Sequence, residues 1–456
     1  MALATINPAT GKTVRTFEPL SSARLEAKLA LAEATFHRHR FDGFSLRKKG
    51  MLAAAEIFEN EQDRLGSLMT LEMGKPIRQA RAEAAKCATA CRFYAEHAES
   101  FLADEPAKIA DGRGFIRYDP LGIVLAIMPW NFPFWQAVRF AAPALMAGNI
   151  GLLKHAANVP QCGLALEDVF LRAGFPEGSF QYLAIESKTV QRVIEDRRIA
   201  AVTLTGSVAA GAAVASIAGR EIKRTVLELG GSDPFIVMPS APLTKTVETA
   251  VKARTQNNGQ SCIAAKRFLV HASVYDEFEK LFIAAFQKLR VGDPMLPETD
   301  MGPLAQAQSV ETLEKQIDFA CRSGARVLTG GHRIPGPGFY FEPTILADAP
   351  IDGPFVEEEL FGPVALLFRV RDLDEAIKIA NGTPYGLGAC IWTQDSAEQE
   401  CAIRYLQSGQ VFVNSMVASQ PALPFGGIKH SGYGRELGAV GIREFMNAKS
   451  VLIAGK

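Results

Sequence analysis

The first part of the chain has the hydrophobic pattern of helices. Between residues 21 and 104 apolar residues recur at helical spacing, and the first proline of this stretch is Pro76. We therefore expect several helices here. The pattern then changes, and residues 115–118 and 123–128 form two short apolar segments on either side of Pro120. Short apolar runs separated by a proline are predicted to be strands.

The rest of the chain alternates between short apolar runs and helical stretches. In a first block, the apolar runs are residues 151–154, 180–185, 201–205 and 225–229, and the helical stretches are 161–173, 187–195 and 209–219. In a second block, the helical stretches are residues 242–256, 274–289 and 308–322, and the apolar runs are 325–328, 364–370, 389–392 and 410–413. This alternation predicts an α/β fold with right-handed βαβ units and parallel sheets. Ligands of such sheets bind beyond the carboxyl ends of the strands.

The length of the chain and its last strand bear on the number of structural units. The 456 residues predict about three units, or two large ones with an appendage. The final apolar run, residues 450–454, has no partner strand nearby in the sequence. A strand without a partner offers its edge to another chain, so this run predicts contact with a second subunit.

Composition and charge exclude several classes of protein. Lys plus Arg and Asp plus Glu number 49 each, so no net charge draws the chain to nucleic acid or to an anionic membrane. The longest apolar run, residues 121–128, is too short to span a bilayer, and residues 1–10 show no signal peptide. The seven cysteines are odd in number and include no CxxC pair, which argues against disulfides and a metal site. These features predict a cytoplasmic protein with no membrane or nucleic-acid partner.

Two residues stand out as candidates for chemistry. Cys262 ends the segment Asn-Asn-Gly-Gln-Ser-Cys, whose small and amide residues are typical of a tight turn that could activate a thiol. Taken alone, it is more often a buried structural cysteine. Glu228 ends an apolar run and precedes two glycines. Burial there would raise its pKa and fit it for general base catalysis, although a partnered structural glutamate is the commoner case.

Two further turns carry polar groups that could meet a ligand. Gly206 and Ser207 follow a predicted strand and open a helix, with Gly211 one turn later, and the free amides of a helix start bind phosphate. The pattern is not GxGxxG and also suits a plain turn. Asn131 lies in the rigid turn Pro-Trp-Asn-Phe-Pro and could donate to an oxyanion, or cap its own turn.

Taken together, these segments resemble the aldehyde dehydrogenase superfamily over essentially the whole chain. Six motifs match in order and in spacing, at residues 129–133, 204–207, 227–231, 260–262, 358–363 and 424–429. The 34-residue step from Glu228 to Cys262 matches as well. Within the superfamily the chain is most similar to bacterial succinate-semialdehyde dehydrogenases of the shorter type.

The resemblance implies a role for each motif residue. Cys262 would attack the aldehyde to form a thiohemiacetal, then a thioester after hydride transfer, and Glu228 would activate the water that releases the acid. Asn131 and the Cys262 N–H would stabilise the oxyanion. The implied cofactor-binding residues are Trp130, Lys154, Ala157, Gly206, Ser207, Gly211, Leu229, Glu359 and Phe361. The implied substrate-binding residues are Arg139, on the helix after the Asn131 turn, and Ser419. A lone arginine in that place could instead serve a structural ion pair.

Three departures from the family pattern refine these expectations. Many NAD-preferring relatives have a ribose-binding glutamate where this chain has Ala157, so NADP is the predicted preferred cofactor and NAD a possible one. The position of a second, redox-active cysteine is Ala264. The position of a second substrate-binding arginine is Gln256, so that carboxylate clamp is incomplete.

The resemblance also implies a domain plan and an assembly. We expect a Rossmann-type cofactor domain at residues 1–110 and 129–231, a catalytic domain at 232–430, and a small β oligomerisation flap with the tail at 111–128 and 431–456. The expected partners are a small aldehyde and other copies of the chain, in a homodimer or homotetramer. Three alternatives stay open: a general short-chain aldehyde dehydrogenase, a catalytically silent relative, and a thiol hydrolase.

Overall fold

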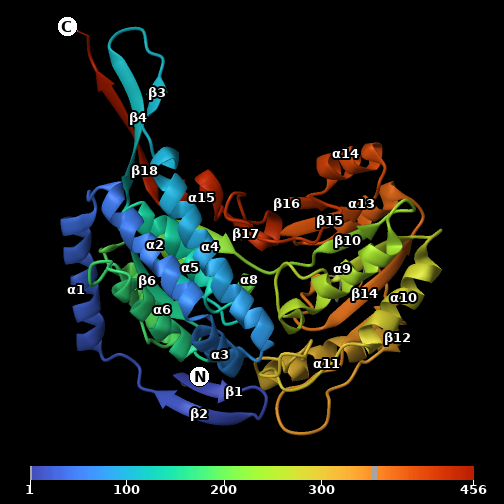
Figure 1. Cartoon of the computed structure of the whole chain (residues 1–456). Helices are drawn as coiled ribbons and strands as arrows, with labels where there is room; N and C mark the ends of the chain where they lie inside the picture. Colours follow the sequence, from blue (N-terminus) through green and yellow to red (C-terminus); the bar gives the residue numbers. More distant parts are fainter. Residues whose placement is uncertain (1–2, 352, 354–356, 456) are drawn as a thin grey trace.

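The computed structural model describes residues 3–351, 353 and 357–455, and these form two α/β lobes with a projecting arm (Figure 1). The sheet of the first lobe has the strand order β17-β9-β8-β5-β6-β7, parallel except for β17. Its strands are β5 (Ile123–Met128), β6 (Ile150–His155), β7 (Phe180–Tyr182), β8 (Ile199–Thr205), β9 (Arg224–Glu228) and β17 (Gly432–Tyr433). A hairpin of β1 (Leu3–Asn7) and β2 (Lys12–Phe17) lies at the base of this lobe.

Side chains of the central strand β5 alternate between two cores, because successive residues of a strand point to opposite faces. Ile123 and Leu125 join the core beneath α1, α7 and α8, whereas Val124 and Ala126 join the core beneath α2, α4, α5 and α6. The helices are α1 (Ser22–His39), α2 (Phe44–Asn60), α3 (Gln62–Met73), α4 (Ile77–Phe101), α5 (Trp135–Met146), α6 (Pro160–Arg172), α7 (Ser187–Glu195) and α8 (Val208–Arg220). The sheet is therefore covered on both faces, as parallel sheets usually are.

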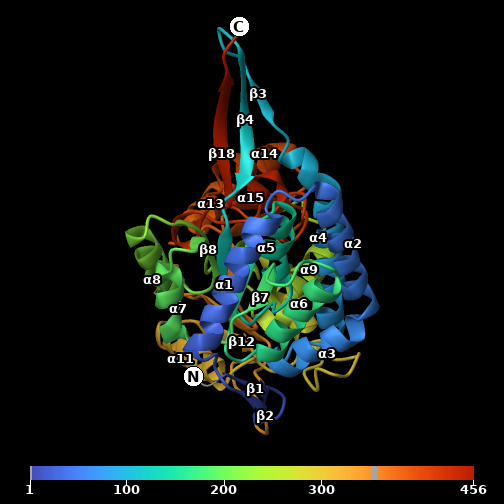
Figure 2. The same cartoon turned by 90° about the vertical axis from the view of Figure 1, so that its left-hand side faces the viewer.

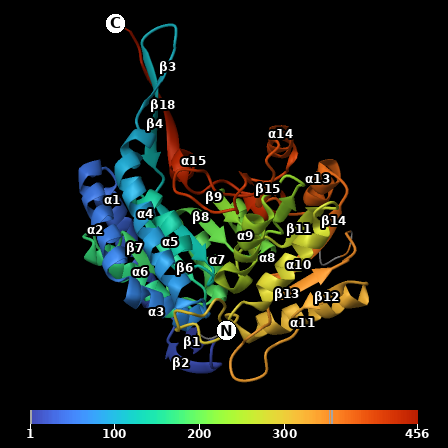
Figure 3. The ribbon, with the colours of Figure 1, turned by 45° about the vertical axis from the view of Figure 1, so that its right-hand side comes forward.

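The second lobe is built around a seven-stranded sheet in the order β12-β13-β14-β11-β10-β15-β16, parallel except for β12. Its strands are β10 (Pro234–Val237), β11 (Arg267–His271), β12 (Arg326–Thr329), β13 (Thr344–Ala347), β14 (Val364–Val370), β15 (Gly388–Trp392) and β16 (Gln410–Val413). Its helices are α9 (Leu243–Thr255), α10 (Tyr275–Gln287), α11 (Ala307–Arg322), α13 (Leu373–Asn381) and α14 (Ser396–Tyr405). Figure 3 shows the two sheets side by side, and the chain passes from the first to the second between β9 and β10. The α/β expectation is confirmed.

The arm is a three-stranded antiparallel sheet that extends away from both lobes, with the C-terminus at its tip (Figure 2). It consists of β3 (Glu105–Ala107), β4 (Arg113–Pro120) and β18 (Met446–Ile453), in the order β18-β4-β3. The tail strand thus has a partner within its own chain, and the expectation of an unpaired tail is wrong. Its partner β4 lies far away in sequence, but β18 pairs with β4 along its whole length and keeps its other edge open.

Two expected boundaries of the flap differ from the topology. β5 lies within residues 111–128 but sits between β6 and β8 in the sheet of the first lobe. Similarly, β17 pairs with β9, and α15 (Gly438–Arg443) packs Ile442 into the first core. Both segments pack against the first lobe, where they bury hydrophobic side chains. The arm strands are only their neighbours in sequence. The arm is therefore smaller than the predicted flap.

Candidate active site

Two cavities meet at Cys262, in the junction between the lobes. One, of about 310 Å³, is lined by Lys86, Arg139, Ser419 and Cys262 among others, and we call it the cationic cavity. The other, of about 280 Å³, lies at the start of α8 and also includes Cys262, and we call it the helix-end cavity. Both volumes suit small-molecule ligands. A thiol shared by two cavities can contact a ligand in each of them.

The loop that carries Cys262 is held in an uncommon backbone conformation. Asn257, Asn258 and Gly259 are all left-handed, with φ of 55°, 58° and 73°. Asparagine and glycine adopt this region most readily, which explains the Asn-Asn-Gly sequence. The Asn257 amide donates to the carbonyls of Asn131 and Gln260, at 2.7 and 2.9 Å. The predicted tight turn is present, and its side chains tie it to the Asn131 turn.

Two buried cationic side chains, Arg254 and Lys266, donate hydrogen bonds to carbonyl groups of the same loop. Arg254 donates to the carbonyls of Gly259 and Ala265, at 2.5 and 3.0 Å. Lys266 donates to the carbonyls of Ser261 and Cys262, at 2.8 and 2.6 Å. Because these carbonyls are bound, the loop has little freedom to turn Cys262 away from the cavities.

The thiol of Cys262 is protonated in this environment. Burial, and secondarily the Glu359 carboxylate, raise its pKa to about 12, against the opposing charge of Lys266. The sequence-based idea that peptide dipoles activate this thiol is therefore not matched by the free protein. The backbone N–H of Cys262 has no acceptor among the described residues, so it can serve a ligand oxygen.

This protonation predicts a pH dependence for alkylation of the free protein. Since the thiolate is the nucleophile, the rate at Cys262 is expected to rise about tenfold per pH unit between pH 7 and 9. Mass spectrometry of the Cys262 peptide after iodoacetamide pulses measures it, and the exposed Cys321 is an internal reference in the same digest. A rate at Cys262 that is already independent of pH near 7 would contradict a protonated thiol.

Glu228 ends β9 and is only 2% exposed, and it lines neither cavity. Within the described residues its carboxylate oxygens accept no hydrogen bond. Burial, and next the nearby Glu436 carboxylate, raise the pKa of Glu228 well above its usual range. Gly426 makes room for it, because a Cβ there would lie 2.7 Å from Glu228 Oε1. The predicted buried carboxyl with a raised pKa is thus present, and its catalytic role stays a prediction.

Asn131 lies at the wall of the helix-end cavity with one amide hydrogen to spare. Its Nδ2 donates to the Gln260 carbonyl at 3.1 Å, and its Oδ1 accepts from Gln136 Nε2 at 3.0 Å. An amide nitrogen carries two hydrogens, so the second is left for a ligand. His155 supports the same turn from below through Nε2, 2.8 Å from the Pro133 carbonyl, and burial lowers the pKa of His155 to about 4.

The helix-end cavity gathers most of the residues predicted to bind a cofactor. Its lining includes Trp130, Gly206, Ser207, Leu229, Glu359 and Phe361. Ser207 is the N-cap of α8 and accepts from the Ala210 N–H, at 3.3 Å, at a helix start suited to phosphate. Glu359 accepts from Lys266 at 3.1 Å and approaches Gly230 so closely that a Cβ there would lie 2.7 Å from Glu359 Oε2.

Three predicted cofactor residues lie outside this lining. Lys154 lies near the carboxyl end of β6, the strand next to β5, and Ala157 follows just after that strand. Burial lowers the pKa of Lys154. Gly211 packs α8 onto the sheet, because a Cβ there would lie 2.6 Å from Leu229. Its position is explained by packing, whereas contacts of Lys154 and Ala157 with a cofactor stay predictions.

Both predicted substrate residues line the cationic cavity and already have partners, although Arg139 Nη2 has no hydrogen-bond partner among the described residues. Arg139 forms an ion pair with Glu436, and its guanidinium lies 4.4 Å from the centre of the Phe425 ring. Ser419 accepts hydrogen bonds from Lys86 Nζ at 2.8 Å and from Trp135 Nε1 at 2.9 Å. Arg139 thus has the structural ion pair that the sequence left open. Nothing in the sequence marked Lys86, which belongs to α4, outside every motif.

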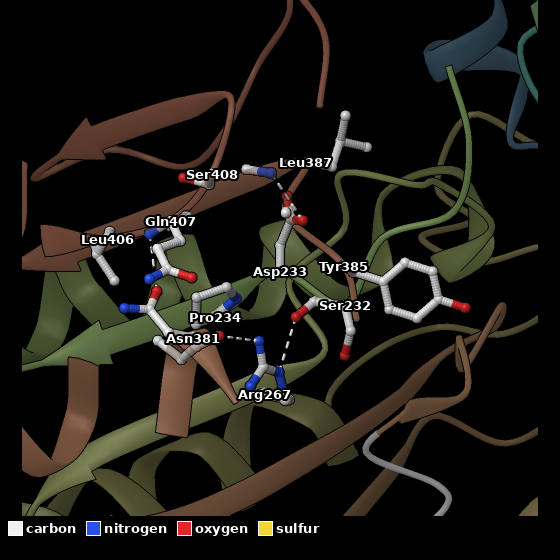
Figure 4. A pocket seen from close by; sticks show the side chains of 14 residues that line it. Ser232, Asp233, Pro234, Arg267, Asn381, Tyr385, Leu387, Leu406, Gln407 and Ser408 are labelled. Carbon is white, nitrogen blue, oxygen red and sulfur yellow. Dashed lines mark hydrogen bonds between the residues drawn. The ribbon is translucent and has the colours of Figure 1, made fainter. Parts of the chain in front are cut away.

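A further pocket, beside the start of β10, holds two charged residues but very little space (Figure 4). Its volume is about 10 Å³. The guanidinium of Arg267 is directed at the backbone. It donates hydrogen bonds to the carbonyls of Ser232, Ile379 and Ala380, at 2.7 to 2.9 Å. Asp233 accepts from the Gly388 N–H at 3.1 Å. These side chains join loops of the second lobe and leave no room for a ligand.

The described residues show neither a metal site nor a membrane-spanning helix. They contain no group of three or more histidine, cysteine, aspartate or glutamate side chains placed to hold a metal ion. None of the helices in residues 3–351 and 357–455 has both the length and the apolar character needed to cross a membrane.

Comparisons with known proteins agree with this geometry. The sequence model of the aldehyde dehydrogenase family matches residues 1–451. The NADP(+) succinate-semialdehyde dehydrogenase of Mycobacterium avium is 56% identical over 99% of this chain and 97% of that protein. A Mycobacterium tuberculosis enzyme of the same name is 55% identical over the full length of both. The crystal structure of succinic semialdehyde dehydrogenase from Streptococcus pyogenes with NADP+ superposes with a TM-score of 0.97, at 37% identity over 100% of both chains.

Proposed function

The chain belongs to the aldehyde dehydrogenase family, and on this basis we propose that it oxidises succinate semialdehyde to succinate with NADP. The observation that carries the proposal is Cys262 at the meeting point of two cavities. One cavity then holds the aldehyde and the other the nicotinamide end of the cofactor. A silent relative would have no use for a thiol in this place, and a thiol hydrolase none for the helix-end cavity.

Cys262 begins the reaction as a nucleophile. Its thiol passes its proton to solvent water, and the thiolate attacks the aldehyde carbon, forming a thiohemiacetal whose oxygen carries negative charge. The spare hydrogen of the Asn131 amide and the free N–H of Cys262 stabilise that oxygen. Each donor of this kind typically contributes about 2.7–4 kcal/mol to the transition state. A nicotinamide bound in the helix-end cavity would serve as the hydride acceptor, and loss of hydride from the carbon would leave a thioester on Cys262.

Glu228 acts in the second half of the reaction. A water molecule attacks the thioester, and Glu228 takes up its proton as general base, which releases the acid and restores Cys262. Because burial raises the pKa of Glu228, the ionised fraction that can act as the base is smaller at a given pH than for an ordinary carboxylate. That fraction grows as the pH rises, so hydrolysis of the thioester becomes faster toward alkaline pH.

The residues of the helix-end cavity fit a dinucleotide. The start of α8 and Ser207 offer hydrogen-bond donors to a pyrophosphate. Leu229 and Phe361 provide an apolar surface on which the nicotinamide ring would pack. Because residue 230 is a glycine without a side chain, there is space for the Glu359 carboxylate, which would bind the nicotinamide ribose. Lys154, in β6, and Ala157, just after it, would face the adenosine ribose.

The preference for NADP rests on Ala157 and Lys154. A glutamate at residue 157 would repel a 2′-phosphate and bind a 2′-hydroxyl, whereas alanine does neither and leaves the Lys154 charge nearby. We expect kcat/KM for NADP to exceed that for NAD, and Ala157→Glu to reverse the order, since one charge-assisted contact contributes about 1.5–3 kcal/mol. Steady-state kinetics with both cofactors measure it. A wild-type kcat/KM tenfold or more higher with NAD would contradict the preference.

The choice of a carboxylate-bearing aldehyde rests on the charge of the cationic cavity. Lys86 and Arg139 line it together with Cys262. A positive field beside the reactive thiol attracts an aldehyde that carries a distal carboxylate. Incubation with succinate semialdehyde and NADP should yield one succinate per NADPH, measured by NMR and absorbance. Reduction of NADP with no succinate formed would contradict the proposed reaction.

Assembly and location complete the proposal. The open edge of β18 lies on an arm that extends away from the lobes, which supports pairing between subunits in a homodimer or homotetramer. All seven cysteines are free thiols, which supports a cytoplasmic location.

A further inference from the structure

Lys86 and Lys252 are the two cationic side chains of the substrate cavity without an ion pair among the described residues, and Lys86 is the less exposed of the two. It lies on α4 and lines the cavity that contains Cys262. Its Nζ donates to Ser419 Oγ at 2.8 Å and lies 4.2 Å from the centre of the Trp135 ring. Among the ion pairs of the described residues, none involves Lys86. Its charge is therefore available to a ligand.

The charged groups nearest to Lys86, Arg139 and Glu83, each have an ion-pair partner. Arg139 is paired with Glu436, and both side chains are at most 5% exposed. Separating them would leave a buried carboxylate without its partner, which is costly. Glu83, one turn before Lys86, is paired with Lys75 and accepts the N–H groups of Phe134 and Trp135, both at 2.9 Å. Neither group neutralises Lys86.

Ser419 has one bonding capacity left, and it is a donor. A hydroxyl oxygen has two lone pairs and one hydrogen. The lone pairs accept from Lys86 and Trp135, and within the described residues the Ser419 hydrogen has no acceptor. An ammonium group and a hydroxyl hydrogen therefore stand next to each other at one wall of the cavity, both suited to a negatively charged oxygen.

The electrostatic environment of Lys86 agrees with an absent counter-ion. Burial, and next the charge of Arg139, lower the pKa of Lys86 to about 8. A carboxylate beside the ammonium would oppose this shift, because an opposite charge favours the ionised form. A bound anion would thus provide the counter-charge that no ion pair among the described residues gives to the Lys86 ammonium group.

We propose that Lys86, together with the hydroxyl of Ser419, grips the distal carboxylate of the substrate. This inference rests on the proposed oxidation of succinate semialdehyde and names the residue that sets its specificity. Arg139, held by its pair with Glu436, has a supporting part, since it lines the same cavity with an Nη2 that has no hydrogen-bond partner among the described residues. Lys86 then replaces, from α4, the arginine that is missing at Gln256, which lines the same cavity.

The test compares charged and uncharged substrates of similar length in matched variants. Lys86→Met keeps most of the side-chain volume and removes the charge. It should lower kcat/KM for succinate semialdehyde about 10- to 100-fold, mainly through KM, as expected for the loss of a charged hydrogen bond. Its kcat/KM for butanal should stay within about threefold of wild type, which also shows that the variant is folded.

Two companion variants separate the grip from other effects. Lys252→Met removes the same charge from an exposed residue of the cavity lining and should change neither substrate by more than about threefold, because exposed charges are screened. Lys86→Arg keeps a cation and should retain most of the preference for succinate semialdehyde. Equal losses for both aldehydes in Lys86→Met, or an unchanged preference, would overturn the assignment of Lys86. A wild-type enzyme without that preference would overturn the proposed function itself.

Discussion

Cys262→Ala is expected to lower kcat by more than about 10³-fold, because no second nucleophile can form the thioester. Among the described residues, Cys262 is the cysteine that lines either cavity. Cofactor binding should persist, since the start of α8 and the apolar walls of the helix-end cavity are unchanged. Steady-state turnover and titration of NADPH fluorescence measure the two effects separately.

The matched control for this variant is Cys401→Ala. Cys401 has a partly buried thiol like that of Cys262, but it lies on α14 of the second lobe. Its removal should leave turnover unchanged. Residual activity of Cys262→Ala within tenfold of wild type, with Cys401→Ala also active, would exclude Cys262 as the nucleophile.

Glu228→Gln is expected to slow the release of the acid and to spare the first oxidation. A general base typically contributes about 10²- to 10⁴-fold, so kcat should fall by that amount. Glutamine keeps the shape of the buried side chain at the end of β9 but cannot take up a proton. Stopped-flow measurement should show a rapid burst of one NADPH per active site, followed by a slow steady state.

The burst amplitude decides where Glu228 acts. The pre-steady-state rate should stay close to that of wild type, because the thiohemiacetal forms without the base. In the wild-type enzyme, kcat should rise with pH while thioester hydrolysis is limiting, since the raised pKa of Glu228 moves the ionisation of this base to higher pH. Loss of the burst together with the steady state in Glu228→Gln would instead give Glu228 a part in forming the thioester.

Much of the fold is predictable because its elements carry strong local patterns. α7 and β14 begin and end at the residues predicted from the sequence, because amphipathic periodicity and a long apolar run mark them clearly. Strands β10, β11 and β13 were not predicted. They are four or five residues long and almost wholly buried, so they show no alternation that distinguishes them from loops or helix ends. The pairing of β18 with β4 joins distant segments and leaves no local signal.

The candidate site divides in the same way. Cys262, Glu228 and Asn131 lie in motifs whose order and spacing identify them, and the structure places all three at the junction of the lobes. Lys86 lies in no motif, and only the packing of α4 against α5 and the Ser419 loop brings it into the cavity. The pairing of Arg139 with Glu436 depends on tertiary contacts that no local pattern encodes.

The central claim is that this enzyme oxidises a short aldehyde with a distal carboxylate and prefers NADP. One steady-state panel tests it most directly, with succinate semialdehyde and butanal each measured against NADP and NAD. We expect the highest kcat/KM for succinate semialdehyde with NADP, at least about tenfold above butanal, the effect of one charged contact in the cationic cavity. A kcat/KM for butanal equal to or above that for succinate semialdehyde would contradict the claim.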